Sequence, residues 1–218
     1  NNKVTNSCLC LEFLGDYEIR NVEMKSGSEW SGEAIKRLLI DFKKSKNLLL
    51  RILIDLEFKR FSQNLELGSF DCGEESLNHF LEDCPNYYKK GISCTHFLLE
   101  KDTKDIVVGF YAICPSSISR KYAEKLEFDI PFPLPSWLIG QLAIDKAYQG
   151  KGIGSKLLFK AIHDILCRAE HGAGAVIYLD ALNDKAKAFY KNRGFLDLGN
   201  GTKKMFMTME RAQNLVRI

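Results

Sequence analysis

The chain has 218 residues, 45% of them hydrophobic, and a net charge of +3 at pH 7. This length and composition predict one domain of ordinary size, or one domain with an extension, around a substantial core. No apolar run approaches the roughly 20 residues that span a membrane, no signal peptide is evident, and the seven cysteines include no CxxC pair, so we expect a cytoplasmic protein with free thiols and no membrane contact.

Residues 1–57 carry little regular pattern. Val4–Phe13 and Tyr17–Met24 could form short strands, and Ser31 could cap a helix with one apolar face. We expect an N-terminal extension packed on the core that follows it. A dimer contact or a docking surface for an inhibitory partner is the alternative.

Residues 58–90 predict the start of the core domain, 58–218. Phe58–Leu67 indicates the first strand, and Asp71 with Glu74 indicates a box-like N-cap for a helix. Leu77, Phe80, Leu81 and Cys84 would face inward on this helix. We expect Pro85 to end it, and a second short helix or loop to carry Tyr87, Tyr88, Lys89 and Lys90.

Two apolar runs, 94–101 and 106–118, are separated by four polar residues and predict a hairpin. Pro131–Pro135 follows a charged segment. Three prolines in five residues predict a rigid extended stretch that cannot be a central strand. This stretch could be a spacer or a lip over a substrate channel.

A glycine loop, Tyr148–Ser155, lies between the strand-like run 137–144 and a helix whose apolar face begins at Ile153. Glycines and free N–H groups at a helix start favour an anion, most often a phosphate. The P-loop pattern is absent from the sequence. The dinucleotide fingerprint fails because Gly154 comes one residue early and only 64 residues follow it.

The remaining elements complete the predicted fold. Residues 175–182 predict a strand parallel to 137–145, with the helix from Ile153 to about Ala169 as the crossover. A helix over 184–192 would end at Gly194, and 203–210 would be a last strand. Together these elements predict an α/β (α+β) fold: a mixed, mostly antiparallel, twisted sheet with helices on both faces.

Three motifs carry a resemblance to a known family. Gln149–Gly154 matches Q/R-x-x-G-x-G/A, the acyl-CoA pyrophosphate loop of the GNAT acetyltransferases, and Asn183–Phe195 resembles their signature N-x-x-A-x-x-F/L-Y-x-x-x-G-F. Ser69–Leu81 is similar to the S-F-D-C-G opening of the GNAT branch that contains tRNA-acetylating toxins of toxin–antitoxin pairs. The resemblance covers roughly 58–210, and it implies a GNAT fold with a splayed central parallel pair of strands.

The resemblance also implies a binding site for acetyl-CoA and requires no metal. Backbone groups of Leu142, Ala143 and Ile144 would bind the pantetheine amides and the thioester oxygen. Asn183 would contact the pantetheine arm, and Phe189 belongs to the same cofactor-binding set. The pyrophosphate would be held by Gln149, Gly150, Lys151, Gly152, Ile153, Gly154 and Ser155.

Tyr190 is the expected general acid for the leaving CoA thiolate, since a phenol with a pKa near 10 stays protonated at neutral pH. No general base stands out, because Glu100, Asp145 and the four histidines are candidates only by residue type. The α-amine of an aminoacyl ester has a lower pKa than a lysine side chain, so we expect that no dedicated base is needed.

The expected acceptor is aminoacyl-tRNA, which would make the protein a translation-blocking toxin with a possible antitoxin partner, and we expect a homodimer. Residues 184–204 hold six basic and two acidic residues, a net charge of +4, which favours a polyanionic acceptor. The expected acceptor contacts are Tyr87, Lys89, Lys90, Lys185, Lys191 and Arg193. The alternatives are a small-molecule or protein amine as acceptor, or a non-catalytic module that binds acyl-CoA.

Overall fold

A computed structural model describes residues 56–61, 69–101, 106–119, 126, 133–169, 174–199 and 201–216. All of them belong to one compact unit, Ile52–Arg217. The elements predicted before residue 56 lie outside the described residues. No described helix is both long enough and apolar enough to cross a membrane.

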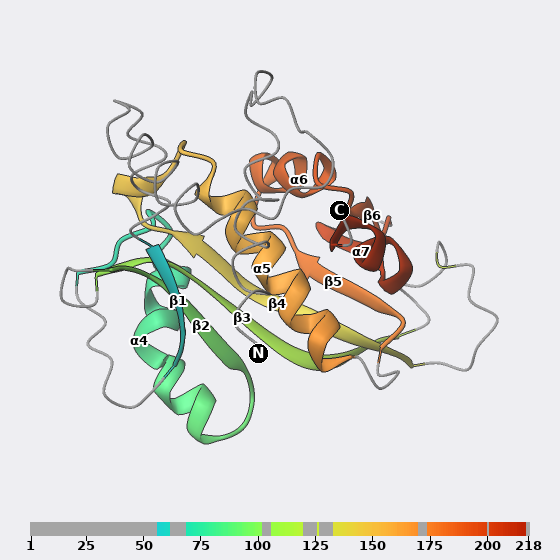
Figure 1. Ribbon diagram of the computed structural model, residues 1–218. Helices are drawn as coiled ribbons and strands as arrows, with labels where there is room; N and C mark the ends of the chain where they lie inside the picture. Colours follow the sequence, from blue (N-terminus) through green and yellow to red (C-terminus); the bar gives the residue numbers. More distant parts are fainter. Residues whose placement is uncertain are drawn as a thin grey trace, which may run out of the picture. The chain divides into compact units, whose positions relative to one another are not determined.

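The described strands form one sheet in the order β1-β2-β3-β4-β5-β7-β6 (Figure 1). Their bounds are Leu56–Arg60 (β1), Cys94–Glu100 (β2), Val107–Ile118 (β3), Leu134–Ile144 (β4), Val176–Asp180 (β5), Leu196–Asp197 (β6) and Lys204–Thr208 (β7). Only β4 and β5 pair in parallel, and the other neighbours are antiparallel. The predicted mixed, mostly antiparallel sheet and the predicted hairpin are therefore confirmed.

Helices cover both faces of the sheet. Alternate residues of a strand point to opposite faces, and on β2 Phe97 and Leu99 pack with α4 (Glu75–Lys89), whereas Leu98 packs with α5 (Ile153–Arg168). Figure 1 shows α5 crossing the sheet face between β3 and β5. Two shorter helices, α6 (Asp184–Lys191) and α7 (Met209–Val216), complete the described part of the fold.

The parallel pair opens toward its C-terminal end. Only Ser136, Trp137 and Leu138 of β4 pair with β5, so residues 139–144 have no described strand on that side. On the other side β4 stays paired with β3 up to Ile144, with an irregularity where Gly140 is skipped. The splay that the family resemblance implied is thus present, and it leaves one edge of β4 open.

Two expectations around α4 are wrong. Pro85 lies inside α4, which continues to Lys89 and therefore includes Tyr87 and Tyr88. Proline removes one helical N–H, and this local loss is tolerated where neighbours such as Leu81 and Cys84 are buried. The predicted box-like cap is also absent: Glu74 is the N-cap and its side chain makes no cap bond, and the Asp71 carboxylate accepts from Gly73, Asn78 and Lys146.

Three strand boundaries also differ. The first strand is Leu56–Arg60, so it starts in the predicted extension, and residues 62–68 are not described. Pro135 lies within β4 near its start, where a missing N–H costs least, and its carbonyl accepts from Ala175 N. The last strand ends at Thr208, whose hydroxyl accepts from Arg211 N and so starts α7, a helix that the strand prediction missed.

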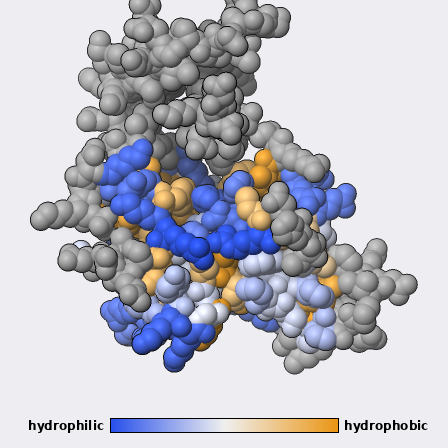
Figure 2. Space-filling model, turned by 60° about the horizontal axis from the view of Figure 1, so that its bottom comes forward, coloured by the Kyte–Doolittle hydropathy of each residue, from blue (hydrophilic) through white to orange (hydrophobic). Residues whose placement is uncertain are grey.

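Figure 2 shows, on the face it presents, hydrophobic residues as separate patches among hydrophilic ones. Three of the described large hydrophobic side chains with the most exposure lie at or just after the end of α4, and the other four lie elsewhere in the chain: Tyr87, Tyr88 and Ile92, and Phe58, Ile106, Leu182 and Leu196. This distribution gives no single broad apolar surface on the described part of the molecule.

Candidate active site

The loop between β4 and α5 presents backbone amides at a helix start. It begins with the short 3-10 helix η2 (Lys146–Tyr148), after which Gly150 and Gly152 have left-handed backbones with φ of 74° and 76°. A side chain at either glycine would meet open space, so it is the backbone angle that favours glycine. No described residue accepts a hydrogen bond from the backbone N–H groups of residues 150–154. These amides, at the positive end of α5, form a site suited to a phosphate.

The side chains of this loop are turned toward the protein. Gln149 Nε2 donates to the carbonyls of Cys72 and Ile144, both at 2.9 Å, which uses both of its N–H groups. Lys151 Nζ donates to the carbonyl of Ala147 at 2.7 Å. An anion at this loop would therefore be held mainly by backbone amides.

Arg193 adds a full positive charge next to these amides. Its Nε and Nη2 donate to Ser155 Oγ at 2.9 and 2.6 Å, and its Nη1 donates to the Phe189 carbonyl at 2.8 Å. The guanidinium carbon lies 3.7 Å from the centre of the Phe189 ring. Partial burial lowers the pKa of Arg193, but a guanidinium stays protonated at neutral pH. The sequence suggested Arg193 as an acceptor contact, and the structure places it beside the loop.

Gly154 brings the loop, β4 and α6 together. A Cβ at Gly154 would lie 3.6 Å from the Phe189 ring and 3.9 Å from Ile144, which is ordinary contact distance. A larger side chain would push the Phe189 ring away. Phe189 thus packs beside the first turn of α5, next to the end of β4.

Leu142, Ala143 and Ile144 lie on the open edge of β4. They pair with Tyr111, Phe110 and Gly109 of β3, and in an antiparallel ladder alternate residues direct their N–H and C=O away from the partner. Gly109 permits this close pairing, since a Cβ there would lie 2.8 Å from the Ala143 carbonyl oxygen. Spacing in the sequence does not reveal this steric role of Gly109, because it depends on the neighbouring strand.

Asn183 and Tyr190 belong to α6. Asn183 is the N-cap, and its Oδ1 accepts from Ala186 N at 2.9 Å. Tyr190 is 9% exposed, with edge-on contacts to Phe189 and Phe195 at ring-centre distances of 5.1 and 5.8 Å. Burial raises the pKa of Tyr190 to about 12, so its phenol is protonated at neutral pH and has a proton to donate.

The other suggested acceptor residues are not gathered at the loop. Tyr87, Lys89 and Lys90 are exposed at the end of α4. Glu75 and Tyr87 are twelve positions apart, about 18 Å along the helix, and the start of α4 is the end that lies near the loop. They could contact only a distant part of a large acceptor. Lys185 and Lys191 are exposed on α6, at the same helix as Tyr190.

Part of the positive charge in 184–204 is offset by ion pairs. Lys187 pairs with Asp197 at 2.5 Å, and Lys204 pairs with Asp180 at the same distance. Asp197 is already counted in the net charge of +4 of this run, so it is the pair with Asp180, which lies outside the run, that makes the run a weaker attractant for polyanions than its sequence suggests.

The general-base candidates among the described residues have other partners. Asp145 accepts from the backbone N–H of Asp71 and Ala147, and Glu100 accepts from the Tyr148 hydroxyl. His79 is exposed and lies beside Glu75 and Glu82, which raise its pKa. His96 is buried, and burial lowers its pKa to about 4. The described residues include no cluster of three or more groups that could hold a metal.

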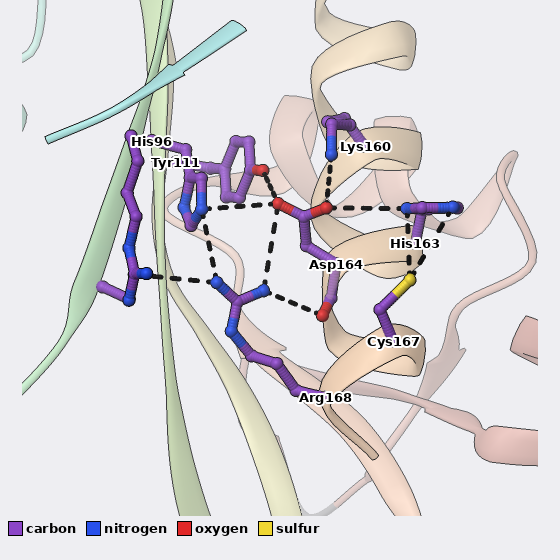
Figure 3. A network of polar contacts seen from close by, with 9 residues as sticks. His96, Tyr111, Lys160, His163, Asp164, Cys167 and Arg168 are labelled. Atoms are coloured by element: carbon purple, nitrogen blue, oxygen red, sulfur yellow. Dashed lines mark hydrogen bonds and ion pairs between the residues drawn. The ribbon is translucent and has the colours of Figure 1, made fainter. Parts of the chain in front are cut away.

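A second polar cluster lies farther along α5, around the buried carboxylate of Asp164 (Figure 3). Its shortest strand contact is the Tyr111 hydroxyl, which donates to Asp164 Oδ2 at 2.5 Å. Its partners among the described residues are His96, Tyr111, Lys160, His163 and Arg168. Eleven residues of helix, about 16 Å, separate Asp164 from Ile153. This cluster joins α5 to β2 and β3 and is not part of the loop site.

A mixed sheet whose single parallel pair opens beside an amide-lined helix start defines the class of GNAT-fold acyltransferases. A family model described as an acetyltransferase (GNAT) domain matches residues 93–196. The chain is 34% identical over 140 residues to the "tRNA-acetylating toxin" of Mycobacterium tuberculosis, which covers 63% of this chain and 82% of that protein.

Two solved structures share the fold over 74% of this chain. One is "AtaT complexed with acetyl-methionyl-tRNAfMet", with a TM-score of 0.67, 29% identity and 99% of that chain covered. The other is a tyrosine-to-phenylalanine mutant of the AtaT toxin bound to the C-terminus of the antitoxin AtaR and to acetyl-CoA, with a TM-score of 0.65, 28% identity and 98% covered. The present chain belongs to the GNAT acetyltransferase family and is an acetyl-CoA-dependent N-acetyltransferase.

Proposed function

We propose that this protein transfers the acetyl group of acetyl-CoA to the α-amino group of an aminoacyl-tRNA and thereby acts as a translation-blocking toxin. The observation that carries the acceptor is the 34% identity over most of a tRNA-acetylating toxin. The exposed lysines at the end of α4 and on α6 are consistent with a polyanionic acceptor larger than the site itself.

The open edge of β4 and the amides of residues 150–154 fit the two ends of acetyl-CoA. Unpaired amides and the nearby Arg193 suit a diphosphate, which needs N–H donors and positive charge. Backbone groups of Leu142, Ala143 and Ile144 would pair with the pantetheine amides and polarise the thioester carbonyl. Asn183 lies at the start of α6, where it would border the pantetheine arm.

Tyr190 is the proposed general acid. The free amine attacks the thioester carbonyl, a C–N bond forms, the C–S bond breaks, and the Tyr190 hydroxyl gives its proton to the leaving thiolate. The amine loses a proton to solvent. A phenol with a pKa of about 12 remains protonated until the thiolate develops and regains its proton afterwards.

The proposed partners follow from the toxin assignment. They are a small antitoxin protein and a second copy of this chain, and the proposed location is the cytoplasm. Of residues 1–57, those before Leu56 are proposed as an extension of the acetyltransferase domain, whose first described strand begins at Leu56.

The test is incubation of the purified protein with labelled acetyl-CoA and bulk charged tRNA, followed by identification of the labelled species. Acetylated aminoacyl-tRNA is the expected product, and deacylated tRNA is the matched control that should stay unlabelled. Label that appears only on a small amine or on protein would overturn the acceptor assignment. CoA binding without label on any amine would indicate a non-catalytic module.

A further inference from the structure

The segment Asp71–Gly73, at the centre of the Ser69–Leu81 motif, is tied to the residues that precede the glycine loop. Asp71 N donates to Asp145 Oδ2 at 2.9 Å, and Lys146 N donates back to the Asp71 carbonyl at 2.9 Å. Lys146 Nζ also donates to Asp71 Oδ2 at 2.7 Å. The two segments are more than 70 residues apart in sequence, so this is a tertiary link and not a local turn.

Gln149 makes a second link between the same two segments. Its Nε2 donates to the Cys72 carbonyl as well as to the Ile144 carbonyl at the end of β4. Gln149 immediately precedes Gly150, the first of the free amides. A single side chain therefore fixes the start of the amide loop to both β4 and the Cys72 backbone.

The Asp71 side of this link is itself held rigidly. Asp71 Oδ1 accepts from Gly73 N at 2.8 Å and from Asn78 Nδ2 at 2.9 Å, while Asn78 Oδ1 accepts from Cys72 N at 3.1 Å. Asn78 is in the first turn of α4, so the segment is anchored to that helix. Gly73 has a φ of 90°, and a Cβ there would lie 2.8 Å from Lys146 Cε, so a side chain would force Lys146 away.

We propose that Asp71 and Gln149 are positioning residues that hold the amide loop of residues 150–154 in the geometry that binds the diphosphate of acetyl-CoA. This rests on the proposed function only in that the loop binds acetyl-CoA, and it is independent of the acceptor. In this assignment the Ser69–Leu81 motif acts on the cofactor side of the site, through the backbone of Asp145–Gln149. Hydrogen bonds from Lys146 and Asn78 hold the pKa of Asp71 at about 2, so it is ionised in any assay near neutrality.

The sign of the effect separates positioning from simple electrostatics. Asp71→Asn removes a negative charge near the proposed site for a diphosphate. The loss of Coulomb repulsion alone would strengthen CoA binding or leave it unchanged. Loss of positioning predicts the opposite: a dissociation constant for CoA raised roughly five- to tenfold. Asp83→Asn is the matched control, because it makes the same change in charge at an exposed position of α4 with no described side-chain contact.

The experiment is calorimetric titration of CoA into the parent, Asp71→Asn, Gln149→Met and Asp83→Asn, with steady-state kinetics alongside. We expect weaker CoA binding and a raised KM for acetyl-CoA in the first two variants, with kcat at saturating acetyl-CoA and KM for the acceptor close to the parent values. Asp83→Asn should match the parent. A purely structural role would lower the melting temperature without this split between KM and kcat.

The inference is overturned if Asp71→Asn is folded and binds CoA as tightly as the parent. If Asp71→Asn does not fold, the inference is overturned by Gln149→Met binding CoA as tightly as the parent. These outcomes differ from failure of the proposed function. If the parent binds CoA and both variants bind it more weakly, but the parent acetylates no charged tRNA, only the acceptor assignment is refuted. A parent that does not bind CoA would refute both proposals.

Discussion

The Tyr190→Phe variant tests the proposed chemistry with the smallest structural change. The ring contacts with Phe189 and Phe195 are kept, and no described residue hydrogen-bonds the hydroxyl, so the free energy of unfolding should change by less than about 1 kcal/mol. If the phenol protonates the thiolate, its loss should lower kcat roughly 100- to 10,000-fold, which corresponds to about 3–5 kcal/mol in the barrier. KM for acetyl-CoA should stay within about twofold, because the hydroxyl acts only as charge develops on sulfur.

The assay for this variant is release of the CoA thiol, measured with a thiol reagent at saturating acetyl-CoA and acceptor. Tyr178→Phe is the control, since it removes a phenol that instead hydrogen-bonds Ser116 at 2.6 Å. A folded Tyr190→Phe protein with the parent kcat would refute the role of the phenol. Equal losses in both variants would show that the effect is one of packing and not of proton donation.

Three further outcomes are expected. In a pH–rate profile, kcat/KM should rise as the acceptor amine loses its proton, and the pH of this rise should shift with an acceptor of different amine pKa. A rise at one fixed pKa near neutrality, whatever the acceptor, would instead indicate a general base on the enzyme. Because burial lowers the pKa of His96 to about 4, below its unfolded value near 6.5, the native state binds fewer protons between these values. The free energy of unfolding should therefore fall by up to roughly 3 kcal/mol as pH falls through this window, and urea melts of His96→Phe should show a shallower fall than the parent. Asp164→Asn should destabilise the protein by about 3 kcal/mol in the same melts, because Lys160 and Arg168 lose the buried carboxylate that pairs with them, whereas Asp180→Asn, where the carboxylate is exposed, should cost less than about 1 kcal/mol.

The parts of the site that sequence could predict are local in the chain. The glycine loop, the helix that follows it and the Asn183–Phe195 signature each depend on spacing within about a dozen residues, and the structure places them as α5 and α6. The same holds for the hairpin of β2 and β3, where two apolar runs flank one polar turn.

The parts that could not be predicted depend on residues far apart in sequence. Ser155 and Arg193 are separated by 38 positions, and Asp71 and Lys146 by 75. The hydrophobic periodicity of a sequence predicts helices and strands, but it does not predict which distant residues will be in contact. A charged run such as 184–204 also says nothing of which lysines are already paired. The helix α7 was missed although Met209, Ala212 and Val216 lie at helical spacing, because it is short and follows directly on the strand β7.

Lys160, Asp164 and Arg168 show how a sequence signal can mislead. Charges of opposite sign spaced by four residues are typical of an exposed helix face. Here Asp164 is buried, because Tyr111 and His96 project from the sheet against that face of α5 (Figure 3). The spacing supplied the cations that make its burial possible, but only the fold determines that the face is covered.

Asp164 and the amide loop lie at opposite ends of one helix, and the contacts along it would pre-organise the loop for the anion that we propose it binds. An amide site stabilises charge best when its dipoles are fixed before the ligand arrives, since otherwise part of the binding energy is spent on ordering them. The Asp164 contacts hold the C-terminal half of α5 to β2 and β3, Arg193 holds its first turn to α6, and Gln149 holds the preceding loop to β4. With three independent restraints on one rigid helix, the amides of residues 150–154 have little freedom to turn away. Weakening the Asp164 contacts should therefore lower stability more than CoA affinity, whereas weakening those of Gln149 should do the reverse.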